Sequence, residues 1–550
     1  MTARQEQFNI VYITRGSSSH PSEGLNVLLS DLIKPLADSG VQVFVHTTDR
    51  HEGSLTRALK ANGVKEHAIT VVRHRVGSIL LGYLSRTTKE RKGGRLQKLI
   101  KGVKNAARSF VTTLADLSGW AADMTWGTFV FKAPIALVMS LVFLVAAGIF
   151  ALFAAIGVFF GSALLTIYLT AMRAYQRVHG STFWGKARLK AIMLRLRKFR
   201  WNLVIDLVNN VYRREQLRLA AAINRKKSIP FLFVPWSFDG ALVSKLRAKK
   251  VIVFPDAVTT LFPLRFPSDH ILPTLNGMKE SLSHADGVIC YSEFVRDVQL
   301  SRFKESMNPE AAVRVIPQGY FQIPEQPIPK HVAHSRLNAE RGRAKNLFPR
   351  LMGAPVVPDF SAFQYILYPT IDRPHKNTLV LAKALNILIR ERYRNVKLVL
   401  TSPALTRDVE SYIHDRRLHR DVIVMPSVPL HVLDTLCAGA AVMVHPSFAE
   451  GGDIFNFSRA VSQGSPALLA NIPVVREMFE RENIDVQTYG PWLFEPTDDI
   501  SLADKIESLL DDSAPMKREQ SAILARLGEY DFAAMAQRYH EFCKEIANEH

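Results

Sequence analysis

The stretch that decides the fold of this chain is residues 445–477, which read HPSFAEGGDIFNFSRAVSQGSPALLANIPVVRE. It follows one apolar strand and leads into another, with a turn at Glu450, Gly451 and Gly452 and a predicted helix over 457–462 between them. A strand, a glycine-rich turn and a helix N-terminus together present free backbone N–H groups, which suit an anionic or hydroxyl-rich ligand. From this segment alone, Glu450 is either a carboxylate that accepts ligand hydroxyls or an acid that caps the helix.

The same segment resembles the donor-sugar loop of retaining family 4 glycosyltransferases, where Glu-Gly-Phe-Gly-Leu-Pro opens a helix and Gly-Thr-Pro-Val-Val follows. Upstream, residues 368–377 (YPTIDRPHKN) resemble the phosphate motif of that family, in which a strand ends in a short loop closing with Lys-Asn. The resemblance covers the C-terminal third well and the first fifty residues loosely. It implies a GT-B fold, that is, two doubly wound Rossmann-like domains that face a cleft.

Alternating strand-like and helix-like segments lead to the same α/β fold class. Strands at 8–14 and 41–47 flank a helix at 25–39, and the alternation resumes after residue 230 and again after 361. This pattern predicts parallel, doubly wound sheets, whose ligands bind beyond the carboxyl ends of the strands. The predicted domain bounds are 1–84 and 231–322 for the first domain, 85–230 for a membrane-associated insertion, 323–360 for a linker, 361–530 for the nucleotide-sugar-binding domain and 531–550 for a closing helix.

The insertion contains a long uncharged run, residues 133–172, whose 40 residues exceed the roughly 20 that one membrane span needs. Two readings compete, one over-long tilted helix or a helical hairpin that turns near Gly148 or Gly157. Both flanks are basic, which favours the cytoplasmic side for both. Because the parts of the first domain before and after the insertion must lie on one side of the bilayer, we expect a hairpin, either spanning or re-entrant.

Charge and cysteine usage point to a partner and a compartment. Lys and Arg outnumber Asp and Glu by 70 to 50, a net charge of +20, which favours nucleic acid or an anionic membrane. No nucleic-acid-binding signature is visible, and basic residues surround an apolar helix face at 189–199, so we expect anionic lipids and no nucleic acid. The three separated cysteines fit reduced thiols, and no signal peptide is visible. The expected location is the cytoplasmic face of the inner (plasma) membrane.

The resemblance implies roles for individual residues. Lys376 and Arg373 would stabilise the departing diphosphate, and Glu450 would bind donor hydroxyls, so these three are the catalytic candidates. Asp256 follows Pro255, where the family has a His, and is either a weak sugar or acceptor contact or a cap of the next turn. The donor-binding candidates are Gly24, Val428, Gly451, Gly452, Asp453, Ile454 and Ser458.

This chain departs from the family pattern in places. Thr370 stands where the family commonly has an Arg, and Ser458 stands where a second glutamate, eight residues after the first, binds the nucleotide ribose. Ser458 or Asn456 would replace that contact, or the nucleotide binds differently, or the site is degenerate. No Asp-x-Asp motif is suitably placed, so we expect no metal and no cofactor, the nucleotide-sugar being a co-substrate.

The leading hypothesis is a retaining hexosyltransferase that moves a sugar from a nucleotide-sugar to a lipid-linked or nascent cell-surface polysaccharide acceptor at the membrane. Retention by front-face attack would let the departing phosphate oxygen take the acceptor proton, so a separate base is not required. One alternative is a nucleotide-sugar epimerase or phosphorylase on a similar fold. Another is a degenerate, non-catalytic scaffold in a glycan assembly complex.

Overall fold

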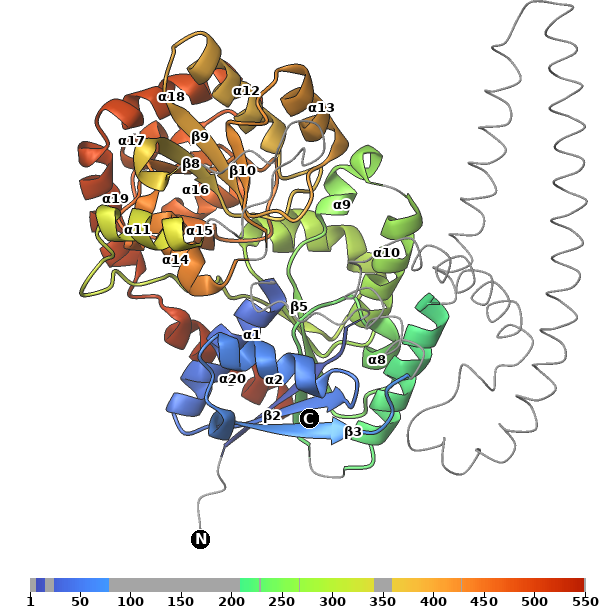
Figure 1. The fold of residues 1–550 in the computed structure, drawn as a ribbon. Helices are drawn as coiled ribbons and strands as arrows, with labels where there is room; N and C mark the ends of the chain where they lie inside the picture. The colour runs from blue at the N-terminus through green and yellow to red at the C-terminus, as the bar shows by residue number, and fades with distance from the viewer. Residues whose placement is uncertain are drawn as a thin grey trace, which may run out of the picture.

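A computed structural model describes residues 6–14, 24–78, 208–226, 229–266, 268–340, 359–426 and 428–548 of the chain (Figure 1). The predicted hairpin at 133–172 and the basic helix face at 189–199 lie outside these residues. The described helices include none that combines the length and the apolar character needed to cross a membrane.

The first sheet has seven parallel strands in the order β3-β2-β1-β4-β5-β6-β7. Strand β1 pairs on one side with β2 and on the other with β4, through Ile10 and Phe233. The sheet is therefore completed by strands on both sides of residues 79–207. The strands are β1 Gln7–Tyr12, β2 Gln42–Thr48, β3 Ile69–His74, β4 Phe231–Val234, β5 Lys249–Phe254, β6 Gly287–Cys290 and β7 Ala312–Val315.

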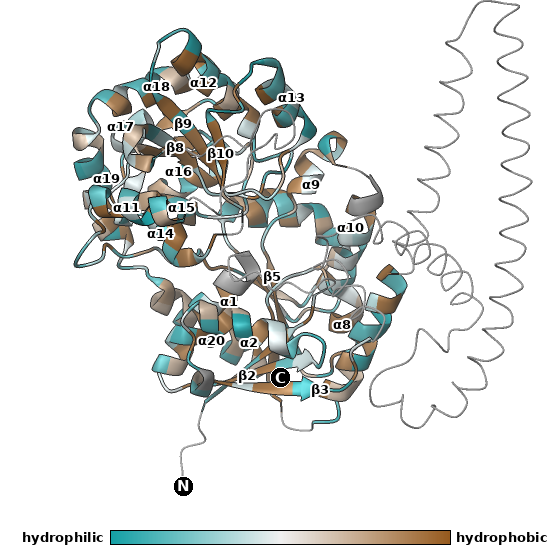
Figure 2. Ribbon diagram, viewed as in Figure 1, coloured by the Kyte–Doolittle hydropathy of each residue, from teal (hydrophilic) through white to brown (hydrophobic). Residues whose placement is uncertain are grey.

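The second sheet has six parallel strands in the order β10-β9-β8-β11-β12-β13. They are β8 Gln364–Tyr368, β9 Val396–Leu400, β10 Val422–Val424, β11 Val442–His445, β12 Ala467–Ala470 and β13 Leu493–Phe494. Central strands of such sheets are covered by helices on both faces and read as continuous apolar runs. Figure 2 shows this, with brown strands inside and teal on the outer faces of the helices. The prediction of two parallel α/β domains is confirmed.

Helices cover both sheets. Those of the first domain are α1 Gly24–Asp38, α2 Glu52–Ala61, α8 Gly240–Val243, α9 Val258–Leu261 and α10 Ser268–Leu282, together with helical residues 208–223. The following helices are α11 Lys330–Ala339, α12 Thr378–Arg390, α13 Arg407–Asp415, α14 Leu430–Gly439, α15 Phe455–Ser462, α16 Pro473–Glu480, α17 Val486–Tyr489, α18 Asp499–Asp511, α19 Ala514–Leu527 and α20 Phe532–Asn548.

The last helix, α20, leaves the second domain and packs on the first. Its buried residues Met535, Tyr539 and Phe542 join the core formed by β1, β2, β4 and α1. In Figure 1 the red α20 lies beside the blue α1. The closing helix predicted from the sequence therefore ties the C-terminal segment to the first sheet.

Candidate active site

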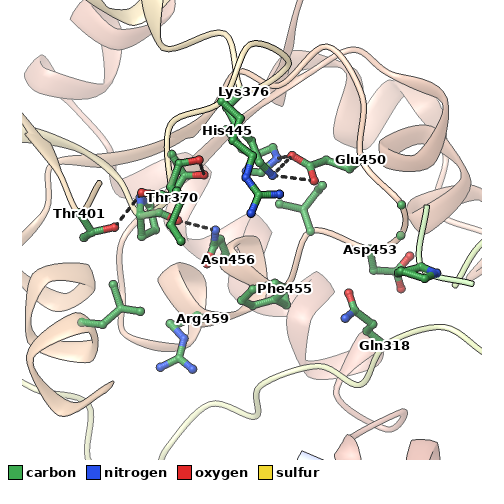
Figure 3. A pocket seen from close by; sticks show the side chains of 18 of the residues that line it. Gln318, Thr370, Lys376, Thr401, His445, Glu450, Asp453, Phe455, Asn456 and Arg459 are labelled. Carbon is green, nitrogen blue, oxygen red and sulfur yellow. Dashed lines mark hydrogen bonds and ion pairs between the residues drawn. The ribbon is translucent and has the colours of Figure 1, made fainter. Parts of the chain in front are cut away.

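A cavity of about 420 Å³ lies between the two domains, lined by loops that follow the carboxyl ends of β8, β9, β10 and β11. Pro255, Asp256, Tyr291 and Gln318 line it from the first domain. Open parallel sheets bind ligands at this edge. Figure 3 shows Lys376 and His445 converging on Glu450, with Arg459 away from them across the cavity.

The centre of the cavity is an ion pair between Lys376 and Glu450. The Lys376 Nζ donates to the two carboxylate oxygens of Glu450 at 2.7 and 2.9 Å, and each side chain is 17% exposed. His445 at the end of β11 adds a contact of 3.0 Å between its Nε2 and Glu450 Oε1. Burial opposes ionisation of Glu450, but the Lys376 charge and the His445 hydrogen bond outweigh it and hold its pKa well below the usual range. Glu450 is therefore a carboxylate that can only accept hydrogen bonds.

Glu450 makes no capping bond to the helix that follows it. The cap of α15 is Ile454, without a side-chain hydrogen bond. Of the two readings that the sequence allows for Glu450, the structure favours the ligand-facing carboxylate, because its oxygens face Lys376 inside the cavity.

The Lys376 loop is fixed by backbone bonds on both sides. Lys376 N donates to Arg373 O at 2.8 Å, and Asn377, in the left-handed region at φ 54°, begins α12. The Asn377 amide donates to the carbonyls of Pro446 and Pro496. These bonds attach the loop to the segment before Glu450. Arg373 also lines the cavity, so two cations and the N-terminus of α12 lie at one end of it, an arrangement that favours phosphate.

The glycine turn brings the two domains into backbone contact. A Cβ at Gly451 would lie 2.0 Å from the Pro255 carbonyl oxygen, and one at Gly452 would lie 2.5 Å from Tyr291 Cβ. Ser292 Oγ donates to Gly451 O at 3.1 Å across the same boundary. The turn therefore requires glycine for this close approach, beyond any role in ligand binding.

The position of Asp256 is compatible with both roles that the sequence left open. Its Oδ1 accepts the backbone N–H of Val258 at 3.2 Å, and the residue also lines the cavity. Burial raises the pKa of Asp256, and the nearby Glu450 carboxylate adds to the rise.

Two predicted donor contacts are occupied by protein groups. Asp453 lines the cavity, but its carboxylate accepts from Tyr320 OH at 2.7 Å and pairs with Arg481 at 2.5 Å. Ser458 is fully buried; its Oγ donates to Phe455 O and accepts from Phe321 N, and it does not line the cavity. Ser458 is therefore not placed to take over the ribose contact.

Of the other predicted donor-binding residues, some line the cavity and one lies next to residues outside the described part of the chain. Ile454 and Val428 line the cavity, and the Asn456 side chain at its wall donates to Pro369 O. Gly24 begins α1 directly after residues 15–23, which lie outside the described part of the chain. Within the described residues, no three His, Cys, Asp or Glu side chains cluster as ligands of a metal ion would.

Sequence reasoning gave no role to some cavity residues. Tyr291 and Gln318 lie just after the carboxyl ends of β6 and β7, and the first sheet thereby places them in the wall of the cavity. The sequence alone does not show this placement. Arg459 directly follows Ser458 in the sequence, but only the fold shows that it lines the cavity.

Comparisons with known proteins agree with this geometry. Residues 365–512, which make up most of the second domain, match the family described as glycosyl transferases group 1. No curated protein matches the chain.

Two solved structures share the fold over nearly the whole length. One is sucrose-phosphate synthase from Thermosynechococcus elongatus, at 12% identity over 98% of this chain and 99% of that chain, with a TM-score of 0.54. The other is Anabaena HepE in complex with UDP and glucose, at 12% identity over 98% of this chain and 100% of that chain, with a TM-score of 0.50. At this identity the likeness concerns the fold, and it agrees with a GT-B arrangement of the two sheets.

Proposed function

We propose that this chain is a membrane-associated retaining glycosyltransferase that moves a sugar from a nucleotide-sugar to a lipid-linked or nascent polysaccharide acceptor on the cytoplasmic face of the plasma membrane. The observation that carries the proposal is the partly buried Lys376–Glu450 pair in the interdomain cavity, on a domain that matches group 1 glycosyl transferases.

The leaving diphosphate needs positive charge as its bond to the sugar breaks. Lys376, Arg373 and the N-terminus of α12 supply it at one end of the cavity. Entry of the diphosphate gives Lys376 an anionic partner in place of Glu450. The Glu450 carboxylate then accepts hydrogen bonds from hydroxyl groups of the donor sugar, next to the backbone N–H groups of the turn at 451–454.

Transfer with retention of the anomeric configuration accounts for every bond and proton without a further catalytic base. The bond between the anomeric carbon and the phosphate oxygen breaks as the acceptor hydroxyl oxygen bonds to the same face of that carbon. The departing phosphate oxygen takes the hydroxyl proton. No metal ion or cofactor is required by this scheme, and the protein's task is to position both substrates and stabilise the diphosphate charge.

A second cavity, of about 780 Å³, supports an acceptor held by the first domain. It shares Pro255, Tyr291, Gln318 and Phe455 with the first cavity, so the two are adjacent. Residues of the helical segment 208–223, which follows residues 79–207 directly, also line it. The uncharged run at 133–172 and its basic flanks support membrane attachment next to this acceptor side.

A non-catalytic scaffold is the alternative. It is favoured by Pro255 in place of the family's His and by Ser458, which does not line the cavity. The intact charge pair argues for an enzyme, because a buried ion pair facing a cavity contributes little to stability.

The test is nucleotide release from a panel of UDP-, GDP- and ADP-sugars by detergent-purified protein, with and without membrane lipid extract. Lys376→Ala and Glu450→Ala should abolish release from the donor that the wild type uses. Lys397→Ala is a matched control, since Lys397 pairs with Asp421 at 2.7 Å with 16% and 18% exposure but does not line the cavity. Silence across the panel without any donor-induced thermal shift would support the scaffold.

A further inference from the structure

Arg459 on α15 is a buried cation that lines the cavity and has no task in the proposed reaction. Arg459 is 4% exposed, and its Nη1 pairs with Asp434 on α14 at 2.5 Å. The guanidinium carbon lies 4.1 Å from the ring centroid of Phe321. Among the described residues, Arg459 Nε has no hydrogen-bond partner. A buried N–H group without a partner in a cavity wall calls for a ligand atom that accepts its hydrogen bond.

The surroundings of Arg459 differ from those of Lys376. Val428, Leu430 and Leu433 line the cavity with Arg459, and they are apolar. A nucleotide-sugar has a charged diphosphate, a sugar and a nucleoside. The diphosphate suits the Lys376 and Arg373 end, and the sugar suits Glu450 and the glycine turn. The apolar wall next to Arg459 is then left for the nucleoside.

The opposite charges of Arg459 and Asp434 restrict the kind of chemical group that the pair can bind. A guanidinium only donates hydrogen bonds and a carboxylate only accepts them. Since the carboxylate of Asp434 already balances the charge of Arg459, the pair suits a neutral group better than a second phosphate. A ribose diol is such a group, because one hydroxyl oxygen can accept from the guanidinium while the neighbouring hydroxyl donates to Asp434.

We infer that Arg459 and Asp434 together form the ribose contact of the donor nucleotide and make the site selective for ribonucleotides. This inference rests on the proposed function. Asp434 does not itself line the cavity, but unlike the fully buried Ser458 its side chain is 33% exposed, and Arg459 holds only its Oδ1 among the contacts described. The acid comes from α14, 24 residues before the position at which the resemblance expects it.

The test measures nucleotide affinity by titration calorimetry on the full-length, detergent-purified chain. The ligand is whichever of UDP, GDP and ADP binds the wild type most tightly, compared with its 2′-deoxy and 3′-deoxy analogues. Loss of one charge-assisted hydrogen bond should weaken at least one analogue by about tenfold in the wild type. Arg459→Met and Asp434→Asn should each weaken the parent nucleotide by about tenfold, and each should bring the ratio between the parent and the analogue that lacks the hydroxyl bound by the altered side chain close to one.

Lys376→Met is the matched control, because removing a phosphate contact should weaken parent and analogues equally and keep their ratio. If Arg459→Met keeps the wild-type ratio of parent to analogue affinity for both analogues, the ribose assignment is overturned while the proposed function stays intact. Failure of the wild type to bind any of the three diphosphates would refute the proposed function itself. If Arg459→Met fails to fold, Asp434→Asn decides, since it keeps the shape of the side chain and leaves Arg459 in place.

Discussion

Lys376 and Glu450 neutralise each other's charge in the wall of the cavity. Such a pair gains attraction in a site of low dielectric constant, but both charges have lost water, so its net contribution to stability is small. Removing one partner is different, since it leaves the other charge in a cavity wall with little solvent. The pair therefore makes each residue sensitive to the presence of the other.

This leads to a prediction for a double-mutant cycle. Lys376→Met and Glu450→Gln alone should each destabilise the fold, by up to about 3 kcal/mol, whereas the double variant should be destabilised by less than their sum. Thermal unfolding of the four proteins measures the coupling. The same cycle on Lys397 and Asp421 gives the reference for a pair outside the cavity. Strict additivity at 376 and 450 would mean that the two side chains do not interact.

At this scale, the sequence reveals residues whose chemistry is local. Lys376 and Glu450 could be singled out because each follows an apolar strand at the edge where parallel sheets bind ligands. The environments of Asp453 and Ser458 could not be predicted. Their partners Tyr320 and Phe321 lie 133 and 137 residues away in the chain, and only the fold brings them together.

The helical segment 208–223 is joined to the end of β2 by a buried ion pair. Glu215 is fully buried, and its carboxylate accepts from Arg50 at 2.9 Å and from Thr48 Oγ1 at 3.1 Å. The Arg50 side chain is 5% exposed. This pair fixes the segment that follows residues 79–207 to the strands of the first domain.

Glu215→Gln should therefore destabilise the first domain by about 3 kcal/mol, because the buried Arg50 side chain would lose the charge of the Glu215 carboxylate. The control is Arg213→Ala, two residues away on the same helix. Arg213 pairs with Glu280 at 57% and 27% exposure, and loss of such a surface pair should cost about 1 kcal/mol or less. Thermal unfolding measures both, and equal effects of the two substitutions would contradict this role of Glu215.

Strands β2 and β3 carry a buried histidine pair that predicts acid sensitivity. His46 Nδ1 lies 3.4 Å from His74 Nε2. Burial, together with repulsion from His74, lowers the pKa of His46 to about 3. Burial also lowers the pKa of His74, to about 4. The unfolded chain binds protons at these sites near pH 6.5 and the folded chain does not. Stability is therefore complete above pH 6.5 and falls as the pH drops toward 4.

His46→Gln removes one of these sites, so the midpoint of thermal unfolding should fall less steeply between pH 6.5 and 4 than in the wild type. Midpoints measured at half-unit pH steps give the comparison. Parallel curves for the two proteins would show that His46 does not contribute to the acid sensitivity.

Element bounds could be predicted where apolar runs end abruptly. The apolar runs at 396–400 (VKLVL) and 467–470 (ALLA) predict strands, and β9 and β12 have these bounds. Helix starts were less accurate, since α15 begins at Phe455 and not at 457. The reason is physical: α14 and α15 begin after Pro429 and Ile454 without a side-chain cap, so no polar residue marks the first turn.

On the scale of the whole molecule, the two domains meet through a few specific contacts. Besides the glycine turn, Glu477 on α16 accepts the backbone N–H groups of Glu293 and Phe294 at 2.5 and 2.9 Å. The glycine turn lines the cavity, and Glu293 and Phe294 closely follow Tyr291, which lines it too. The width of the site therefore depends on how closely the domains approach.

Gly451→Ala should force the domains apart, because the added methyl group would lie 2.0 Å from the Pro255 carbonyl oxygen. We expect a larger radius of gyration in small-angle X-ray scattering and a loss of transfer activity of at least about tenfold. Gly490→Ala is the control, since a Cβ there meets no atom within 4 Å and its φ is not positive. An unchanged scattering curve and full activity of Gly451→Ala would refute the requirement for close approach.

The return of α20 to the first domain has a consequence for synthesis on the ribosome. The core that α20 closes with Tyr539, Phe542 and Cys543 also contains Phe8 and Ile10 of β1. The nascent chain makes β1 first but cannot cover this face until the whole second domain has emerged. The first domain to be translated is therefore the last to be completed, and its uncovered apolar sheet is the surface that needs chaperone protection in the interval.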